Sequence, residues 1–386
     1  MDAVDAMEGL IPVTLLTGFL GSGKTTVLNR LLRQPKLEET AVIVNEFGEV
    51  GLDHLLIGRT SSGAVLLNNG CVCCTVRGQL DETLLDLLVQ RARGEIPKFR
   101  RVIIETTGLA DPAPILHLLI SDPVVTVRYR MGGVVTTVDA VNGWDTLDRN
   151  MEALRQAAVA DRLLITKTDL AGAESSARLR SRLAALNPGA RMQDVIAGVV
   201  DPARLFDTAL YQPESKTLDV QGWLRAEAYE EACEENHEEN AGHEHCGPQC
   251  THDAHDTHDT HDTHDTHEGH AHHHHHDKSR HDHGISSFCF IREEPVRWTA
   301  FSSWMEMLAA HRGRDLLRVK GIVNIADRPG RPVVIHGVQQ IFHPPLSLDA
   351  WPDGDHRTRI VFITRNLDQT ALHRTLEIFE AESESA

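Results

Sequence analysis

The sequence predicts an α/β protein in which a domain built on a mainly parallel sheet is followed by a smaller α+β domain. Two observations support this prediction. Short apolar runs alternate with helical patterns over residues 12–200, and comparable order returns at residue 285 after a long polar stretch. Alternation of strands and helices is typical of parallel sheets that helices cover on both faces.

The strands of the first domain are predicted from short apolar runs rich in β-branched residues. We expect strands at Val13–Thr17, Ala41–Val44, Val102–Glu105, Gly133–Val138 and Leu163–Thr166. Helical patterns follow or separate them, at Lys24–Arg33, Gln79–Arg93, Pro114–Leu119, Leu147–Ala160 and Ser175–Leu186. The strand runs are continuously apolar, which indicates burial on both faces of the sheet.

Residues 230–284 are too polar to form a core. This stretch holds most of the 24 histidines, many acidic residues, four HDT triplets and a run of five histidines. Such a composition cannot bury enough apolar surface to offset the entropy of ordering, so we predict a disordered insert. The predicted boundaries are 1–222 for the first domain, 223–284 for the flexible insert and 285–386 for the second domain.

The second domain mixes strands and helices in a less regular order, as α+β domains do. Strands are expected at Ser286–Ile291, Leu316–Ile325, Pro332–His343 and Thr358–Thr364, and a last helix at Leu367–Ala381. Another helix, at Val296–His311, is predicted because large apolar residues recur there at spacings of three and four.

The composition argues against several classes of protein. A formal net charge of −18 disfavours a nucleic-acid partner. No apolar run reaches the roughly 18 residues of a membrane-spanning helix, and the acidic first ten residues do not resemble a signal peptide. Seven cysteines, three of them within four positions, make a poor disulfide framework. We therefore expect a reducing cytoplasm, where thiols stay free for metal or redox chemistry.

The segment GFLGSGKT, from Gly18 to Thr25, matches the phosphate-loop pattern G-x-x-x-x-G-K-[ST] between a predicted strand and a predicted helix. Glycines let successive backbone N–H groups converge on phosphate oxygens, and the helix N-terminus adds a positive partial charge. Lys24 can reach the β- and γ-phosphates, and the hydroxyl of Thr25 can bind Mg²⁺. The motif predicts a P-loop NTPase; these residues alone leave an ATP-dependent kinase open.

Two further strand ends carry nucleotide chemistry. One is followed by TKTD, where GTPases commonly have N-K-x-D, and Thr166 replaces the usual Asn. Asp169 can accept hydrogen bonds from guanine N1–H and N2–H₂, and the stem of Lys167 would lie over the base. The other ends in Glu105, an acid that can hold the Mg²⁺ shell through water, with Gly108 placed to sense the γ-phosphate. The alternatives are an ordinary charged turn for TKTD and, for Glu105, a carboxylate that caps the next segment.

Cys71, Cys73 and Cys74 lie within the run NNGCVCCT and are too close together to form good disulfides with one another. Thiolates are soft ligands that suit a tetrahedral zinc site, and Glu49 or water could complete it. Inert buried thiols or a redox pair are the alternatives. The histidines of the insert favour metal binding, because imidazole binds zinc, cobalt, nickel and copper. A polar linker without a role is the alternative for the insert.

Together these motifs resemble the CobW family of P-loop GTPases. The resemblance covers most of the chain except the insert. It lies in GFLGSGKTT, VNEFGEVG, NNGCVCCT, ETTGLADP and TKTDL of the first domain and in LLRVKGI, IHGVQQIFHPP and TRIVFI of the second. Five ordered matches in the first domain are far more specific than any one of them.

The resemblance implies a GTPase that converts GTP and water to GDP and phosphate and delivers a metal to a client metalloprotein. Residues that would act in hydrolysis with Mg²⁺ are Lys24, Thr25, Glu105 and Glu46. Residues that would bind GTP are Gly18, Gly21, Ser22, Gly23, Lys24, Thr25, Thr26, Gly108, Lys167 and Asp169. Metal ligands would be Cys71, Cys73, Cys74 and Glu49.

We expect the metal to be zinc, with cobalt as the alternative in cobalamin synthesis or nitrile hydratase activation. A P-loop kinase with structural cysteines and a non-enzymatic His-rich metal buffer remain rival functions. Glu46 and Glu49 are both candidates for the water-positioning residue. The client and the oligomeric state, with a dimer among the options, stay open at this point.

Overall fold

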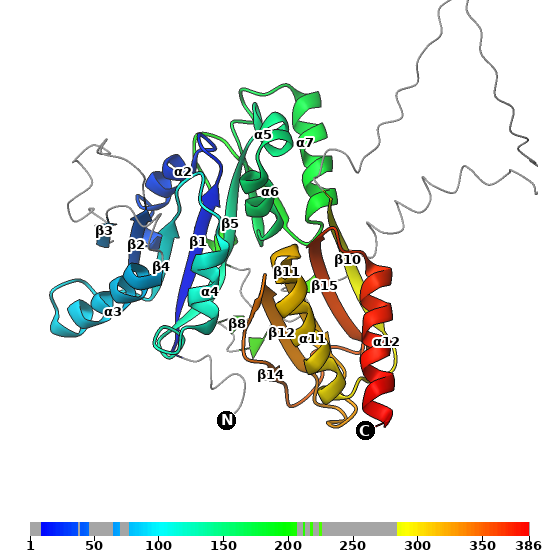
Figure 1. The fold of residues 1–386 in the computed structure, drawn as a ribbon. Coiled ribbons are helices and arrows are strands. Elements are labelled where there is room, and N and C mark those ends of the chain that lie inside the picture. The colour runs from blue at the N-terminus through cyan, green and yellow to red at the C-terminus, as the bar shows by residue number, and fades with distance from the viewer. Residues whose placement is uncertain are drawn as a thin grey trace, which may run out of the picture.

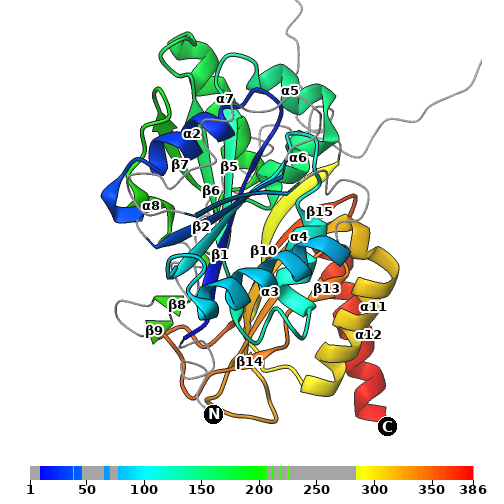
Figure 2. The ribbon, with the colours of Figure 1, turned by 90° about the vertical axis from the view of Figure 1, so that its left-hand side faces the viewer.

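The structure is a computed structural model that describes residues 9–37, 39–45, 65–69, 77–206, 211–212, 217–218, 224–225 and 284–385. Within these residues the chain forms two large sheets, each with helices packed against it (Figures 1 and 2). The first is parallel and the second antiparallel, which confirms the predicted fold class. Apart from residues 224–225 and 284, the predicted insert (223–284) lies outside the described residues.

The first sheet has the strand order β3-β2-β4-β1-β5-β6-β7, and its described pairs are all parallel. Its strands are β1 (Ile11–Gly18), β2 (Thr40–Asn45), β3 (Val65–Asn69), β4 (Arg101–Glu105), β5 (Tyr129–Asp139), β6 (Arg162–Thr166) and β7 (Arg191–Val195). Because parallel strands all end on one side, the loops that follow β1, β4, β5 and β6 gather at a single edge.

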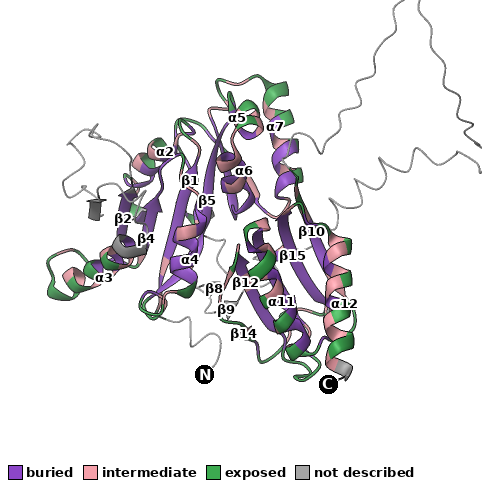
Figure 3. Ribbon diagram, viewed as in Figure 1, coloured by how far each residue is buried: buried purple, intermediate pink, exposed green. Residues whose placement is uncertain are grey.

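Helices cover both faces of this sheet. One face packs against α2 (Lys24–Leu31) and α8 (Pro202–Leu205), and the other against α3 (Arg77–Arg93), α4 (Ala113–Ser121), α5 (Gly143–Arg149), α6 (Met151–Ala158) and α7 (Ala173–Leu186). Successive residues of β1 show why its sequence is continuously apolar: Leu15 packs in the core on one face and Leu16 in the core on the other. Figure 3 shows β1, β4 and β5 as mostly buried.

The second sheet has the order β10-β15-β11-β12-β13, with β14 beside β12, and its pairs are antiparallel. The elements are β10 (Ile285–Arg292), α11 (Trp298–Arg312), β11 (Leu316–Val323), β12 (Val333–Val338), β13 (Ile341–Phe342), β14 (Leu346–Ser347), β15 (Thr358–Arg365) and α12 (Gln369–Ser385). Trp304 on α11 is fully buried against Phe290 and Phe362 of the sheet, with ring centroids 5.8 and 6.3 Å away. A separate short pair, β8 (Tyr211–Gln212) and β9 (Thr217–Leu218), completes the described strands.

Two elements that were predicted as single are each divided into two in the structure. The helix expected at Leu147–Ala160 is two helices, because Asn150 adopts an extended conformation between α5 and α6. The strand expected at Pro332–His343 is a hairpin of β12 and β13, because Gln339 turns the chain with a left-handed φ of 54°. The apolar pattern continues through both breaks, so the pattern alone did not reveal them.

Two strands of the first sheet were not predicted. β3 and β7 lie at its two edges. In β7, only Val195 is buried; three of the four preceding residues are polar, and all four are at least partly exposed. An edge strand needs fewer apolar residues than a central strand, which explains why the sequence RMQDV gave no signal.

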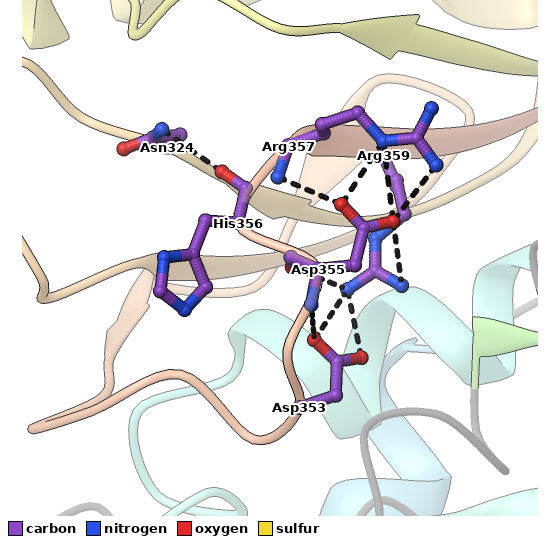
Figure 4. A network of polar contacts seen from close by, with 6 residues as sticks. All are labelled: Asn324, Asp353, Asp355, His356, Arg357 and Arg359. Atoms are coloured by element: carbon purple, nitrogen blue, oxygen red, sulfur yellow. Dashed lines mark hydrogen bonds and ion pairs between the residues drawn. The ribbon is translucent and has the colours of Figure 1, made fainter.

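Acid–arginine contacts hold the loop that leads into β15 (Figure 4). Arg359 lies 2.9 Å from Asp353, and both side chains are buried. Arg357 binds Asp355 at 2.9 Å, and this hydrogen bond lowers the pKa of the Asp355 carboxyl. These contacts fix the start of β15, which lies between β10 and β11 in the sheet.

The two domains meet at a buried group of charges, Asp161, Arg318 and Lys320, which we call the interdomain ion cluster. Asp161 immediately precedes β6, whereas Arg318 and Lys320 lie on β11. One carboxylate oxygen of Asp161 accepts hydrogen bonds from Arg318 at 2.7 Å and Lys320 at 2.6 Å. Its other oxygen accepts the backbone N–H of Val134 at 2.8 Å. The cluster therefore ties β11 to both β5 and β6.

Burial has opposite consequences for the two titratable members of the cluster. Burial favours the neutral form of Asp161, but the charges of Arg318 and Lys320 lower its pKa below the usual value. Burial lowers the pKa of Lys320 to about 8, although Asp161 opposes this shift. The pair thus keeps its carboxylate ionised inside a closed interface.

A second contact between the domains is largely apolar. Val338 of β12 is fully buried within the core formed by α3, α4 and the first sheet. Its carbonyl oxygen lies 2.8 Å from the ring nitrogen Nε2 of His117 on α4. The interface is therefore packed like a domain core, and the two domains are positioned by both apolar and ionic contacts.

Asp161→Asn should lower the free energy of unfolding by about 3–5 kcal/mol, because it leaves Arg318 and Lys320 buried without their carboxylate. Urea denaturation measures this difference. Glu39→Gln is the matched control: Glu39 pairs with Arg100 at 2.7 Å, but both side chains are exposed. That variant should change the free energy of unfolding by about 0–1 kcal/mol.

The effect of Asp161→Asn should also depend on pH. Because the folded-state pKa of Asp161 is lowered, its contribution is fully present above the ordinary value of 3.8 and is lost as pH falls below it. The difference in unfolding free energy between the two proteins should therefore narrow below pH 3.8. A difference that stays constant through this range would contradict the assignment of the stabilisation to the carboxylate.

Candidate nucleotide site

The phosphate loop connects β1 to α2 and depends on glycine at defined positions. Gly18, Gly21 and Gly23 adopt φ values of 140°, 73° and 94°, a region that other residues rarely enter. At Gly18 the constraint is also spatial, because a Cβ atom there would lie 2.3 Å from the hydroxyl oxygen of Thr137. The loop therefore lies directly against the end of β5.

Lys24 begins α2, and its ammonium group lies inside the loop. Its Nζ donates hydrogen bonds to the carbonyl oxygens of Gly18 at 2.8 Å and Phe19 at 3.1 Å. The side chain is buried, so its charge is held where the loop closes. Thr26 follows in the first turn of α2 and is exposed. This arrangement positions a cation and the N–H groups of a helix N-terminus toward one point, as phosphate binding requires.

Thr25 and Glu105 come together although they are 80 residues apart. The Thr25 hydroxyl donates to Glu105 Oε1 at 2.6 Å, and Glu105 is buried at the end of β4. Both present hard oxygen atoms, the ligand type that Mg²⁺ prefers. The donor set therefore fits a magnesium ion, either directly or through bound water.

Gly108 lies against the phosphate loop. A Cβ atom at this position would be 2.6 Å from the backbone nitrogen of Leu20, so only glycine allows the approach. The buried side chain of Gln156, on α6, donates to the carbonyl oxygens of Gly108 at 3.1 Å and Ala110 at 3.0 Å. The sequence had given no reason to single out Gln156; a fully buried amide in an apolar helix face is the signal that could have found it.

The TKTD turn is joined to the phosphate loop through Thr166. Its hydroxyl donates to the carbonyl oxygen of Ser22 at 2.7 Å, so the residue that departs from the usual Asn still links the two segments. Lys167 has a left-handed φ of 58°, and its Nζ lies 2.7 Å from Asp139 Oδ2. Asp169 is exposed at the same edge.

Two residues that the sequence reasoning missed support this turn. Burial favours the neutral form of Asp139, but the hydrogen bond from Lys167 lowers its pKa, so the carboxylate stays charged. Thr137 exchanges a hydrogen bond with the hydroxyl of Ser22 at 2.6 Å. A cavity of about 130 Å³ lies between the phosphate loop, the end of β5 and α6, and Lys167 and Gln156 line it.

Several predicted site residues lie outside the described part of the chain: Glu46, Glu49, Cys71, Cys73 and Cys74. The strands that lead toward them are described, and the last residues of β2 and β3, Asn45 and Asn69, are paired with each other. Among described residues, no three His, Cys, Asp or Glu side chains gather as a metal site would require. Cys289, on β10, is buried and forms no disulfide among the described residues.

The sheet and its phosphate loop define a P-loop nucleotide-binding protein. Residues 12–194 match the family model for the CobW/HypB/UreG nucleotide-binding domain, and residues 285–380 match that for the cobalamin synthesis protein CobW C-terminal domain. None of the described helices is both long and apolar enough to cross a membrane.

Curated relatives and solved structures agree with these matches. The chain is 33% identical over 353 residues to the zinc chaperone YjiA of Escherichia coli, across 92% of this chain and 93% of that protein. It is 28% identical over 374 residues to zinc-regulated GTPase metalloprotein activator 1 of Schizosaccharomyces pombe, across 92% and 83% of the two chains. The crystal structure of zinc-bound YjiA from E. coli superposes with a TM-score of 0.66 at 30% identity and covers 96% of this chain and 99% of that one. The chain therefore belongs to the CobW family of P-loop GTPases, as its motifs predicted.

Thr166→Val should weaken the binding of GTP and GDP alike, by about tenfold, because it leaves the Ser22 carbonyl without its hydroxyl donor. Thr166→Ser keeps the hydroxyl and is the matched control. Calorimetric titration with both nucleotides measures the effect. Equal affinities in the Val and Ser variants would show that the hydroxyl bridge does not support the loop.

Proposed function

We propose that this chain is a GTP-hydrolysing metallochaperone that transfers zinc from a CxCC site to a client metalloprotein. The proposal rests mainly on the observation that the strands leading to the nucleotide and metal residues end at one edge of the first sheet. β2 and β3 run toward the segments with Glu46, Glu49 and the three cysteines, and they end on the same side as β1 and β4. β3 and β1 are three strand positions apart, or about 14 Å at the usual spacing.

The proposed nucleotide roles follow from the described contacts. The backbone of Gly18, Gly21, Ser22 and Gly23 would bind phosphate oxygens, and the ammonium of Lys24 would stabilise charge on the transferring phosphoryl group. Thr26 extends this cradle into α2. Gly108 would meet the γ-phosphate, because it already touches the loop at Leu20.

The base and the metal ion would be bound from the neighbouring strand ends. Asp169 would accept the guanine N1–H and N2–H₂ groups, and Lys167 would cover the base plane while Asp139 orients its ammonium. Thr25 and Glu105 would hold Mg²⁺, which supplies charge neutralisation between the phosphates when bound. We propose Glu46 as the residue that positions the attacking water.

For the transferred metal we propose Cys71, Cys73 and Cys74 with Glu49 as the ligands. Three thiolates and a carboxylate suit tetrahedral zinc, and a labile fourth position suits an ion that must leave. The names of the relatives favour zinc over cobalt. A reducing compartment such as the cytoplasm would keep these thiols free, and we propose that location.

The two rival functions predict different behaviour. A P-loop kinase needs a small-molecule acceptor and would favour ATP. A His-rich buffer would lose its function on deletion of residues 237–283, whereas a chaperone would retain GTP hydrolysis and CxCC binding. The membership of the CobW family supports the chaperone over both.

Asp169→Ala should weaken GTP binding far more than ATP binding, because only guanine uses the carboxylate. Lys24→Ala should abolish turnover by removing the charge that stabilises the transition state. Phosphate release and nucleotide titration measure these effects. Glu174→Ala, a change of another acid near the same edge at the start of α7, should leave both unchanged. Equal affinity of the unaltered protein for GTP and ATP would exclude the guanine assignment.

Metal and nucleotide binding should be coupled, because β2, which leads to Glu49, ends beside Glu105, and β3, which leads to the cysteines, ends beside β2. Zinc affinity should differ between the GDP complex and the complex with a non-hydrolysable GTP analogue, by a factor of about 5–150 if the coupling is of usual size. A metal-competition titration of protein lacking residues 237–283 measures both affinities without the background of the histidines. Repeating it with cobalt tests the choice of metal.

Cys73→Ser should remove the tight site and the response of GTP turnover to zinc, while GTP binding stays intact. Cys289→Ala is the matched control, because Cys289 is a buried thiol in the other domain. Identical zinc affinity in the GDP complex and the GTP-analogue complex would show that the metal site and the nucleotide site are not energetically coupled.

A further inference from the structure

Gln156 makes a contact that neither nucleotide binding nor metal binding explains. Its side chain is completely buried on α6, and its amide nitrogen donates to the carbonyl oxygens of both Gly108 and Ala110. Two acceptors on one side fix the orientation of the amide, because only the nitrogen can donate. Its Oε1 finds no hydrogen-bond partner among the described residues. The amide is therefore committed to holding the backbone that carries Gly108.

Arg155, the residue before Gln156 on α6, binds the same segment. Arg155 Nη1 lies 3.1 Å from Asp111 Oδ2, and each side chain is 29% exposed. Two successive side chains of α6 thus contact the short segment from Gly108 to Asp111. Any movement of α6 must either carry this segment with it or break these hydrogen bonds.

The other end of α6 belongs to the contact with the second domain. Arg318 of β11 donates to the carbonyl oxygen of Val159, the residue that ends the helix, and also binds Asp161. Ala158, in the last turn, packs in a core otherwise formed mostly by residues of the second domain. Gln156 and Val159 are three residues apart, or roughly 4.5 Å along a helix axis.

The segment held by Gln156 is the one that touches the phosphate loop. Gly108 approaches Leu20 so closely that no Cβ fits between them. A continuous series of short contacts therefore runs from the phosphate loop through Gly108 and Gln156 to Val159 and Arg318. Gln156 and Val159 are joined by the α6 backbone, and the other steps are packed or hydrogen-bonded, so the series is a physical route for energetic coupling.

We propose that α6 couples the contact between the two domains to the segment that senses the γ-phosphate, and that Gln156 is the positioning residue in this coupling. Its consequence is that the second domain sets how strongly the first prefers GTP over GDP. The inference requires nucleotide binding at the phosphate loop, but it does not require the metal transfer proposed above. If nucleotide binding holds but metal transfer fails, this coupling still stands, and failure of the coupling leaves the metal transfer untouched.

The first test is the ratio of GTP to GDP affinity in the full-length protein. Gln156→Met keeps the volume but removes the donor, and it should lower the ratio by about tenfold, mainly through weaker GTP binding. Gln34→Met is the matched control, because Gln34 Nε2 also donates to a backbone carbonyl, that of Val200 at 2.9 Å, away from Gly108. It should leave the ratio unchanged. An unchanged ratio in Gln156→Met would overturn the positioning role.

Gln156→Glu separates positioning from a general loss of packing. The ionised carboxylate would face two carbonyl oxygens, so its pKa should rise, and the protonated form could again donate one hydrogen bond. The GTP-to-GDP ratio of this variant should therefore increase as pH falls, relative to Gln156→Met. The nearby charged pairs Arg155–Asp111 and Lys167–Asp139 are present in both variants, so their titration cancels in the comparison. Parallel pH profiles would overturn the proposal.

The second test is a double-mutant cycle between the domains. Lys320→Met removes one charge of the interdomain ion cluster but leaves the Asp161–Arg318 pair, and thermal unfolding verifies that the variant is folded. Lys320→Met should lower the ratio of GTP to GDP affinity when Gln156 is unaltered. It should have no further effect on this ratio when combined with Gln156→Met. Additive effects, or no effect in the Gln156 protein, would overturn the coupling. If Lys320→Met weakened the binding of GTP and GDP equally, the proposed coupling would also be overturned. That result would indicate that the ion cluster affects nucleotide binding through β6 and the TKTD turn, not through α6 and Gly108.

Discussion

The contact between the phosphate loop and its two neighbours constrains the rest of the first domain. Gly18 lies against Thr137 of β5, and Leu20 lies against Gly108, which follows β4. At both places the distance leaves no room for a Cβ atom. A loop that encloses a phosphate must approach the strands beside it, so β4, β1 and β5 have to be adjacent and must end at the same level. The order of the sheet and the parallel direction of its strands meet this requirement.

The glycines of the phosphate loop have no side chains that could attach the loop to the sheet. Hydroxyl groups at this edge make those attachments. Ser22 is held by Thr137, and the carbonyl of Ser22 is held by Thr166, so the loop is attached to both β5 and β6. This explains how the chain tolerates threonine where asparagine is usual. The hydroxyl is short, but the strand brings it within hydrogen-bond distance. The departure in sequence therefore preserves the connection between the phosphate and base regions.

Sequence reasoning located the segments whose chemistry is local and missed the residues whose partners are distant in the chain. The phosphate loop, the acid at the end of β4 and the TKTD turn were predicted because each follows an apolar strand and contains its own chemistry. Gln156 and Asp161 were not, since one contacts a segment 48 residues earlier in the chain and the other contacts residues 157 and 159 positions later. A polar residue within an apolar pattern was the available signal. The breaks at Asn150 and Gln339 were missed because apolar residues continue on both sides of each turn.

The segment that follows β4 lies at the meeting point of three different contacts. Glu105 reaches Thr25, Gly108 touches Leu20, and the carbonyls of Gly108 and Ala110 bind Gln156. On its other side, β4 pairs with β2, whose last residue precedes Glu46 by one position. The presence or absence of a single phosphate group would therefore act on a segment that already contacts both the strand leading to the proposed metal ligands and the helix leading to the second domain. Because binding free energies are reciprocal, a metal ion or a change at the domain contact that alters this segment must alter nucleotide preference by the same factor. Coupling of this kind needs no long pathway, since each neighbour is one contact away from Gly108 or Glu105.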